Sequence, residues 1–94
     1  MSATVRDNPG RNRYELELEG GTAFVTYRRS PGVVTLLHAE VPPELEGRGF
    51  GSAVVRGTLD LLRADGSKVV PVCPFIVAFI RRHPEYRDLL ANER

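Results

Sequence analysis

Polar and apolar residues alternate along the first third of the chain and predict antiparallel strands. In residues 13–19 a tyrosine and two leucines alternate with three glutamates, so one face is apolar and the other charged. This period of two is typical of a half-buried strand. Gly20-Gly21 is a hairpin signal, and residues 22–29 form the predicted partner strand. A short first strand is predicted at residues 4–7, before the turn-forming Asn8-Pro9-Gly10.

The middle of the chain changes from a strand pattern to a helical one. Residues 33–41 are apolar on both faces at their start, which predicts a central strand. Residues 49–65 carry apolar positions at helical spacing, and Gly66 is placed to end that helix. Residues 68–72 form a fifth strand, in which Pro71 indicates an edge or a bulge. A strand–helix–strand unit predicts that the last two strands are parallel, with a right-handed connection.

The C-terminal part of the chain predicts short helices. Pro74 opens the first of them, whose apolar stripe is expected to lie on the sheet and consists of Phe75, Ile76, Phe79 and Ile80. Pro84 interrupts this helix, and a final turn or helix follows it. The whole pattern predicts an α/β (α+β) domain over residues 1–94, with a mixed, mostly antiparallel sheet of about five strands.

Composition narrows the class of protein. Hydrophobic residues make up 41% and charged residues 27% of the chain, which is typical of a folded globular domain. A net charge of +1 gives no reason to expect nucleic acid or a membrane as a partner. The first residues lack the apolar core of a signal peptide, and a single cysteine cannot form an internal disulfide. We therefore expect a cytoplasmic protein, and a monomer.

The clearest chemical signal lies between the fourth strand and the helix. Residues 40–52 pass through two prolines and then place glycine at alternate positions, Gly47, Gly49 and Gly51. Glycines allow a tight turn, and a helix that begins there presents unpaired N–H groups and the positive end of its dipole. This predicts an anion site, usually for pyrophosphate. The loop lacks the lysine of a P-loop and the spacing of a dinucleotide fingerprint; the alternative is a turn that binds nothing.

Three further polar side chains fall at the carboxyl ends of the fourth and fifth strands, where open α/β sheets bind ligands. His38 and Glu40 are two residues apart, so they share one face of the strand. Cys73 closes the fifth strand. The pair could equally be an ordinary solvent-facing pair, and the cysteine a small core residue.

Two blocks of sequence extend these signals. The first joins His38-Ala39-Glu40-Val41-Pro42 to Leu45-Glu46-Gly47-Arg48-Gly49-Phe50-Gly51-Ser52, and the second covers residues 66–75 and continues to Arg82-His83-Pro84-Glu85-Tyr86. With both blocks in this order, the sequence resembles the short, stand-alone GNAT-like N-acetyltransferase family over nearly its whole length. The resemblance implies a minimal GNAT-like acyl-CoA N-acyltransferase fold, with acetyl-CoA as co-substrate and no metal.

The resemblance also implies how coenzyme A is held. In the wider GNAT superfamily the loop reads Arg/Gln-x-x-Gly-x-Gly/Ala, and its backbone N–H groups bind the pyrophosphate. Glu46 stands at the Arg/Gln position here, so we expect its carboxylate to point away from the phosphates. Arg48 would supply positive charge instead, and Arg81 or Arg82 would reach the 3′-phosphate. The remaining predicted contacts are Val41, Gly49, Phe50, Gly51, Ser52, Cys73 and Pro74.

Catalytic roles follow from the same resemblance. Glu40, directly or through water, is the predicted base that deprotonates the amine, and His38 is the alternative base. A backbone N–H near Val41 would donate a hydrogen bond to the acyl carbonyl oxygen. Cys73 has two possible roles. In direct transfer, which the superfamily usually follows, it lines the pocket or protonates the departing thiolate; in double displacement it takes the acetyl group first.

These roles predict an acetyl-CoA-dependent N-acetyltransferase that acts on a primary amine. Two other hypotheses stay open: a module that binds CoA or acyl-CoA with little turnover, and a scaffold in which the glycine loop and the His38/Glu40 pair have no chemical role. Binding of CoA would exclude the scaffold, and turnover with a panel of amines would separate the enzyme from the binding module.

Overall fold

Five strands form one mixed sheet in the computed structural model, which describes residues 4–91. They follow one another in the sheet in chain order: β1 (Val5–Asn8), β2 (Arg13–Leu18), β3 (Gly21–Ser30), β4 (Val33–Glu40) and β5 (Lys68–Pro71). The first four strands pair antiparallel, and β5 lies parallel to β4 at the edge. This confirms the predicted mixed sheet, the edge position of Pro71 and the parallel pairing of the last two strands.

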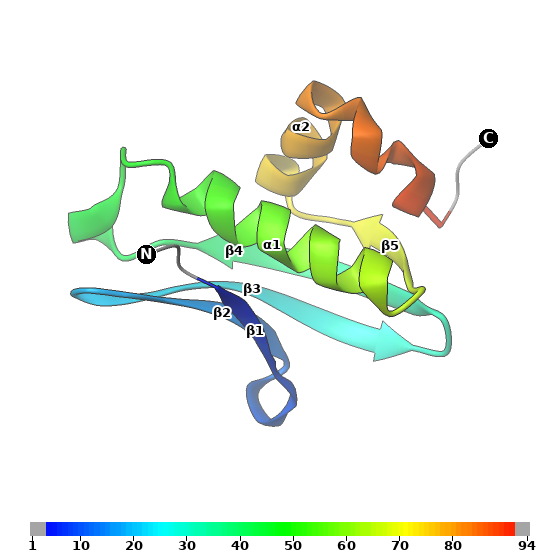
Figure 1. The fold of residues 1–94 in the computed structure, drawn as a ribbon, viewed down its shortest axis with the longest axis horizontal. Helices are drawn as coiled ribbons and strands as arrows, with labels where there is room; N and C mark the ends of the chain where they lie inside the picture. Colours follow the sequence, from blue (N-terminus) through cyan, green and yellow to red (C-terminus); the bar gives the residue numbers. More distant parts are fainter. Residues whose placement is uncertain (1–3, 92–94) are drawn as a thin grey trace.

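Both α-helices lie on one face of this sheet (Figure 1). Helix α1 (Phe50–Ala64) connects β4 to β5, and α2 (Pro74–Arg82) follows β5. Short 3₁₀ helices lie at Pro9–Arg11, Pro43–Leu45 and Pro84–Leu89. Within residues 4–91 no α-helix covers the other face of the sheet, which we call the outer face. No helix in that range is long and apolar enough to span a membrane.

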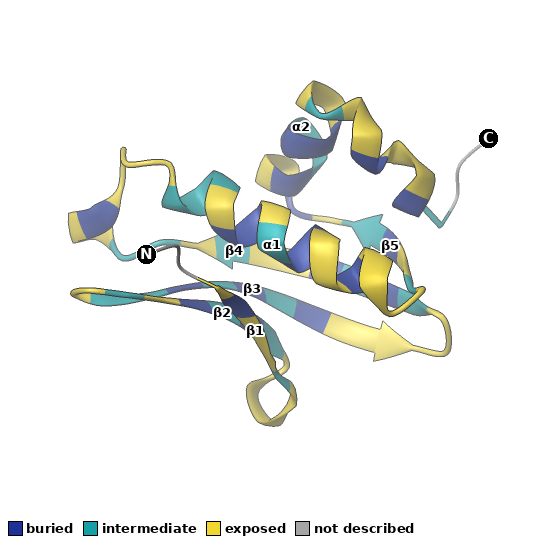
Figure 2. Cartoon of the chain, in the orientation of Figure 1, coloured by how far each residue is buried: buried dark blue, intermediate teal, exposed yellow. Residues whose placement is uncertain are grey.

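The inner face of the sheet and the two α-helices share one hydrophobic core. The predicted apolar stripe of α1 is fully buried, while its other side is exposed (Figure 2). The helix approaches β1 closely at Gly57, where an added Cβ would lie 2.8 Å from Val5 Cβ. Burial of each large apolar side chain contributes about 1.5–3 kcal/mol, so this packing fixes the position of α1 and of the loop that leads into it.

A β-bulge at Leu37 changes the direction of the side chains that follow it in β4. The neighbours Thr26 and Tyr27 on β3 pair with His38 and Leu36, so Leu37 is an extra residue. Strict alternation would turn His38 inward together with the buried Leu36. The bulge turns it to the outer face instead, where it is exposed.

Tyr86 fixes the last 3₁₀ helix against α1. Its side chain is buried, its hydroxyl donates to Asp60 Oδ1 at 2.7 Å, and Arg56 Nη1 donates to the same hydroxyl at 3.1 Å. Burial, together with the bond to the Asp60 carboxylate, raises the pKa of Tyr86 above its ordinary value of 10.0. The hydroxyl therefore bonds two charged side chains from α1.

Replacing Tyr86 with phenylalanine is expected to lower the free energy of unfolding by about 1.5 kcal/mol and Tm by about 8 °C. Because the tyrosine pKa is higher in the folded chain than in the unfolded chain, the wild-type advantage is fully present below pH 10 and is lost as the pH rises above it. Thermal unfolding of both proteins between pH 7 and pH 11 measures the difference. Equal stability at pH 7 would contradict the prediction.

Candidate functional site

The paired part of β5 ends before β4 does. The register closes with Leu36 opposite Pro71, and Val72 N donates to Leu36 O at 2.9 Å. The chain then turns away through Cys73 into α2. In the described part of the chain, residues 37–41 therefore have no partner from β5. A gap opens between two diverging parallel strands, with the bare edge of β4 along one side.

The bare edge of β4 turns backbone N–H groups toward this gap. Along a strand, residues whose side chains point to the same face of the sheet also direct their N–H and C=O groups to the same neighbouring strand. The carbonyl group of the buried Leu36 points toward β5, because its oxygen accepts a hydrogen bond from Val72 N. Ala39 and Val41 pack on the same inner core, so we infer that their N–H groups point toward the gap as well.

The loop between β4 and α1 forms a backbone cradle. Gly47 and Gly49 both have φ +83°, a left-handed conformation that favours glycine, and Gly49 directly precedes the helix. The N–H groups of residues 50–52 precede the first intrahelical bond, from Ala53 N to Gly49 O, and no side chain caps the helix at Gly49. The positive end of the helix dipole adds to their preference for an anion.

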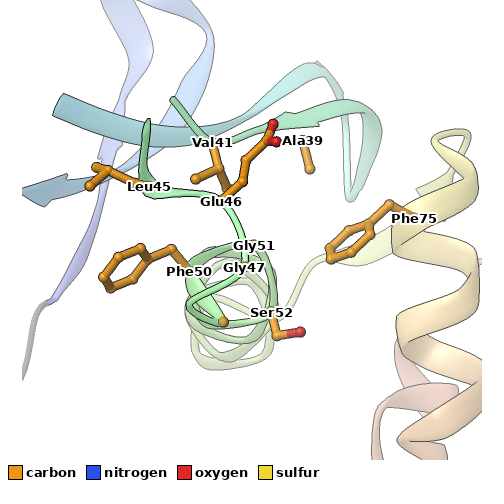
Figure 3. A pocket seen from close by; sticks show the side chains of 10 residues that line it. Ala39, Val41, Leu45, Glu46, Gly47, Phe50, Gly51, Ser52 and Phe75 are labelled. Carbon is orange, nitrogen blue, oxygen red and sulfur yellow. The ribbon is translucent and has the colours of Figure 1, made fainter. Parts of the chain in front are cut away.

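A pocket of about 360 Å³ joins the gap to the cradle (Figure 3). In Figure 3 the rings of Phe50 and Phe75 lie on either side of the start of α1. The wall is formed by the end of β4, the glycine loop and the first residues of α1 and α2: Ala39, Val41, Leu45, Glu46, Gly47, Gly49, Phe50, Gly51, Ser52 and Phe75. Apolar walls beside free N–H groups suit a ligand with both apolar and anionic parts.

The structure brings half of the predicted coenzyme A contacts to this pocket. These are Val41, Gly49, Phe50, Gly51 and Ser52. These five residues therefore share one pocket wall, and the anion site itself stays a prediction.

The other predicted contacts lie away from the pocket wall. Arg48 is exposed in the glycine loop, and Pro74 is exposed at the start of α2. Arg82 is exposed at the other end of α2. Arg81 lines a separate hollow of about 270 Å³ together with Arg87. No cationic side chain is therefore part of the pocket wall in the described structure.

Glu46 lines the pocket, and the expectation that its carboxylate points away from the phosphates stays a prediction. In Figure 3 the carboxylate extends toward Ala39 and Val41. The cause lies in the preceding turn: Leu45 is buried beneath the β2–β3 hairpin, 3.9 Å from the position that a Cβ on Gly21 would take. Glu46 itself is extended, with φ −67° and ψ 154°, and neighbours in an extended chain point to opposite sides.

His38 and Glu40 form a pair on the outer face, as predicted from their spacing. His38 Nε2 lies 3.0 Å from Glu40 Oε1, and the two side chains are 56% and 54% exposed. Both belong to the part of β4 that β5 does not pair with. The pair therefore flanks the gap from the outer face, while the pocket opens on the inner face.

Cys73 belongs to the core rather than to the pocket. It is 8% exposed and packs in the same cluster as Ile76 and Phe79. Its backbone carbonyl accepts from Ile76 N and Val77 N at 3.0 Å, which begins α2. The position of Cys73 is therefore that of a small core residue, which was one of the interpretations of its place in the sequence.

Phe75 is a pocket residue that sequence reasoning missed. Its place in an apolar stripe predicted that it would lie on the sheet, but it is 42% exposed and forms part of the pocket wall. A Cβ added at Gly51 would lie 3.1 Å from the end of its ring. The sequence signal that could have identified it is its place directly after Pro74, where the chain has just left the sheet.

A mixed sheet whose fourth and fifth strands diverge beside a glycine loop and a helix start defines a GNAT-like α+β protein. The family model of GCN5-related N-acetyl-transferases matches residues 13–89, and the chain belongs to this family. Membership implies an acyl-CoA co-substrate.

The fold agrees with that of a solved relative. The NMR solution structure of a GCN5-like protein from Staphylococcus aureus has a TM-score of 0.69 to this chain at 20% sequence identity. The match covers 92% of this chain and 85% of that one. None of the curated proteins compared matches the sequence.

Proposed function

We propose that the protein transfers an acetyl group from acetyl-CoA to a primary amine by direct transfer, with Glu40 as the general base. The observation that carries this proposal is the gap between β4 and β5, which the glycine-loop pocket borders on the inner face and the His38/Glu40 pair flanks on the outer face. Membership of the family supports the choice of donor.

The residues of the pocket fit the donor. Acetyl-CoA supplies an acetyl group that is activated as a thioester. The first N–H groups of α1, from Phe50 to Ser52, would hold the diphosphate, because no side chain caps this helix. The exposed Arg48 would add positive charge, and Arg81 or Arg82 stays the predicted contact of the 3′-phosphate.

The bare edge of β4 would stabilise the charge that develops during transfer. The N–H of Val41, which we infer to face the gap, is the proposed donor to the acyl oxygen as it becomes negative. One such donor is worth about 3 kcal/mol. No movement of the strand is needed for this, since the edge is already free of a β5 partner.

The base acts on the acceptor from the outer face. A protonated amine has no free electron pair, so it must lose a proton before it can attack. The Glu40 carboxylate is exposed beside the gap, and its partner His38 lies within hydrogen-bonding distance to take up the proton next. His38 is the alternative base, because a neutral imidazole also accepts a proton.

Cys73→Ala tests the choice of direct transfer. Because Cys73 is 8% exposed and absent from the pocket wall, we expect the variant to lose about 1 kcal/mol of stability and to keep its transfer rate at a temperature where it is folded. Single-turnover acetylation and a CoA titration measure the two properties. Loss of all transfer with CoA binding retained would instead show that the thiol carries the acetyl group.

The test of the proposed function combines heat stability with turnover. CoA should raise Tm saturably, because a ligand that binds only the folded state stabilises it. Release of free CoA from acetyl-CoA is then followed with a panel of primary amines, including a lysine peptide, a polyamine and small metabolites. Heat protection without turnover on any amine would support a CoA-binding module instead, and the absence of protection would contradict both functions.

A further inference from the structure

Glu46 is the ionisable residue on a pocket wall that is otherwise apolar or neutral. Of the residues that line the pocket, no other carries a charged side chain. Within residues 4–91, no side chain forms a hydrogen bond or an ion pair with the Glu46 carboxylate. The charge is therefore not neutralised by a neighbouring cation.

The position of this charge opposes the ligand that the cradle favours. The helix start and the glycine loop attract an anion, whereas the carboxylate one residue before Gly47 repels it. Figure 3 shows the carboxylate extending from the loop toward Ala39 and Val41, which line the same pocket. A neutral ligand of the same shape would meet no repulsion.

We propose that Glu46 is an affinity- and specificity-determining residue: its carboxylate weakens the binding of diphosphate-bearing donors and leaves neutral thioesters unaffected. The inference rests on the proposed function, because it concerns the same pocket. The proposal predicts that the wild-type protein binds CoA with low affinity, and that the charge of Glu46, rather than the shape of the pocket, lowers this affinity.

Glu44 offers a matched control. It lies two residues before Glu46, in the 3₁₀ helix Pro43–Leu45, is exposed and is not part of the pocket wall. Glu44→Gln removes the same charge from the same segment as Glu46→Gln. A difference between the two variants therefore reports the position of the charge and not the net charge of the protein.

The experiment measures Kd by calorimetry for CoA and for pantetheine, which lacks all the phosphate groups, with the wild type and both variants. Glu46→Gln should bind CoA about 10-fold more tightly and pantetheine unchanged, while Glu44→Gln should match the wild type for both. Raising the salt concentration should narrow the difference for CoA. Thermal unfolding confirms that each variant is folded.

Three outcomes would overturn the inference while leaving the proposed function intact. One is measurable CoA binding with the same Kd in Glu46→Gln and in the wild type. The second is equal tightening of CoA binding by Glu44→Gln, and the third is equal tightening of pantetheine binding by Glu46→Gln. Absence of CoA binding in the wild type and in both folded variants would overturn the proposed function and this inference together.

Discussion

Glu40→Gln is expected to lower the turnover of acetyl transfer by about 100-fold or more, with the Kd of CoA nearly unchanged. Glutamine keeps the shape of the side chain but cannot accept the proton of the amine. Glu40 lies on the outer face, opposite the pocket, so its replacement should leave the donor site intact. Steady-state rates from pH 6 to pH 10, with CoA titrations alongside, measure both effects.

The control for this prediction is Glu17→Gln, because Glu17 is an exposed carboxylate on the same face, in β2, two strands away from Glu40. We expect it to retain the wild-type rate. His38→Gln separates the two candidate bases: a loss much larger than that of Glu40→Gln would assign the base to His38. An unchanged rate in Glu40→Gln across the whole pH range would remove Glu40 from the mechanism.

Gly51→Ala is expected to weaken CoA binding by about 10-fold or more without lowering the stability of the fold. The added Cβ would lie 3.1 Å from the Phe75 ring and 3.7 Å from Val41 Cγ2, between two parts of the pocket wall. Phe75 is exposed, so its ring can move aside. Alanine is favoured over glycine in a helix by about 1 kcal/mol, so binding and stability should change in opposite directions.

Ala53→Ser is the matched control, since it adds one heavy atom to the same helix at an exposed position outside the pocket wall. It should bind CoA as the wild type does. Calorimetric Kd values and Tm are measured for both variants. If Gly51→Ala bound CoA with wild-type affinity, the ligand would not pass between α1 and α2, and the proposed placement of the donor would be wrong.

The sequence predicted the fold in detail because its local signals agree with one another. The alternation in residues 13–19, the helical stripe that ends before Gly66 and the position of Pro71 all specify elements that the structure contains. The hairpin was displaced by one residue: Gly21 already pairs with Leu18, so the tight turn is formed by residues 19 and 20. Such a shift changes no side-chain face in the core.

The site was less predictable, because its side chains depend on contacts that are distant in sequence. Nothing local to residues 33–41 reveals the bulge at Leu37, which is visible only in the pairing with β3. The direction of Glu46 depends on Leu45 finding its place beneath the β2–β3 hairpin. The glycine loop could be predicted, since its backbone conformation follows from the residue type alone.

The bulge at Leu37 determines which face of the sheet carries His38 and Glu40 at the end of β4. The same residues paired with β3 in regular alternation, without the bulge, would turn an imidazole and a carboxylate into the hydrophobic interior, where an unpaired charge is strongly unfavourable. Transfer of the His38/Glu40 pair to another sheet would therefore require transfer of the bulge as well.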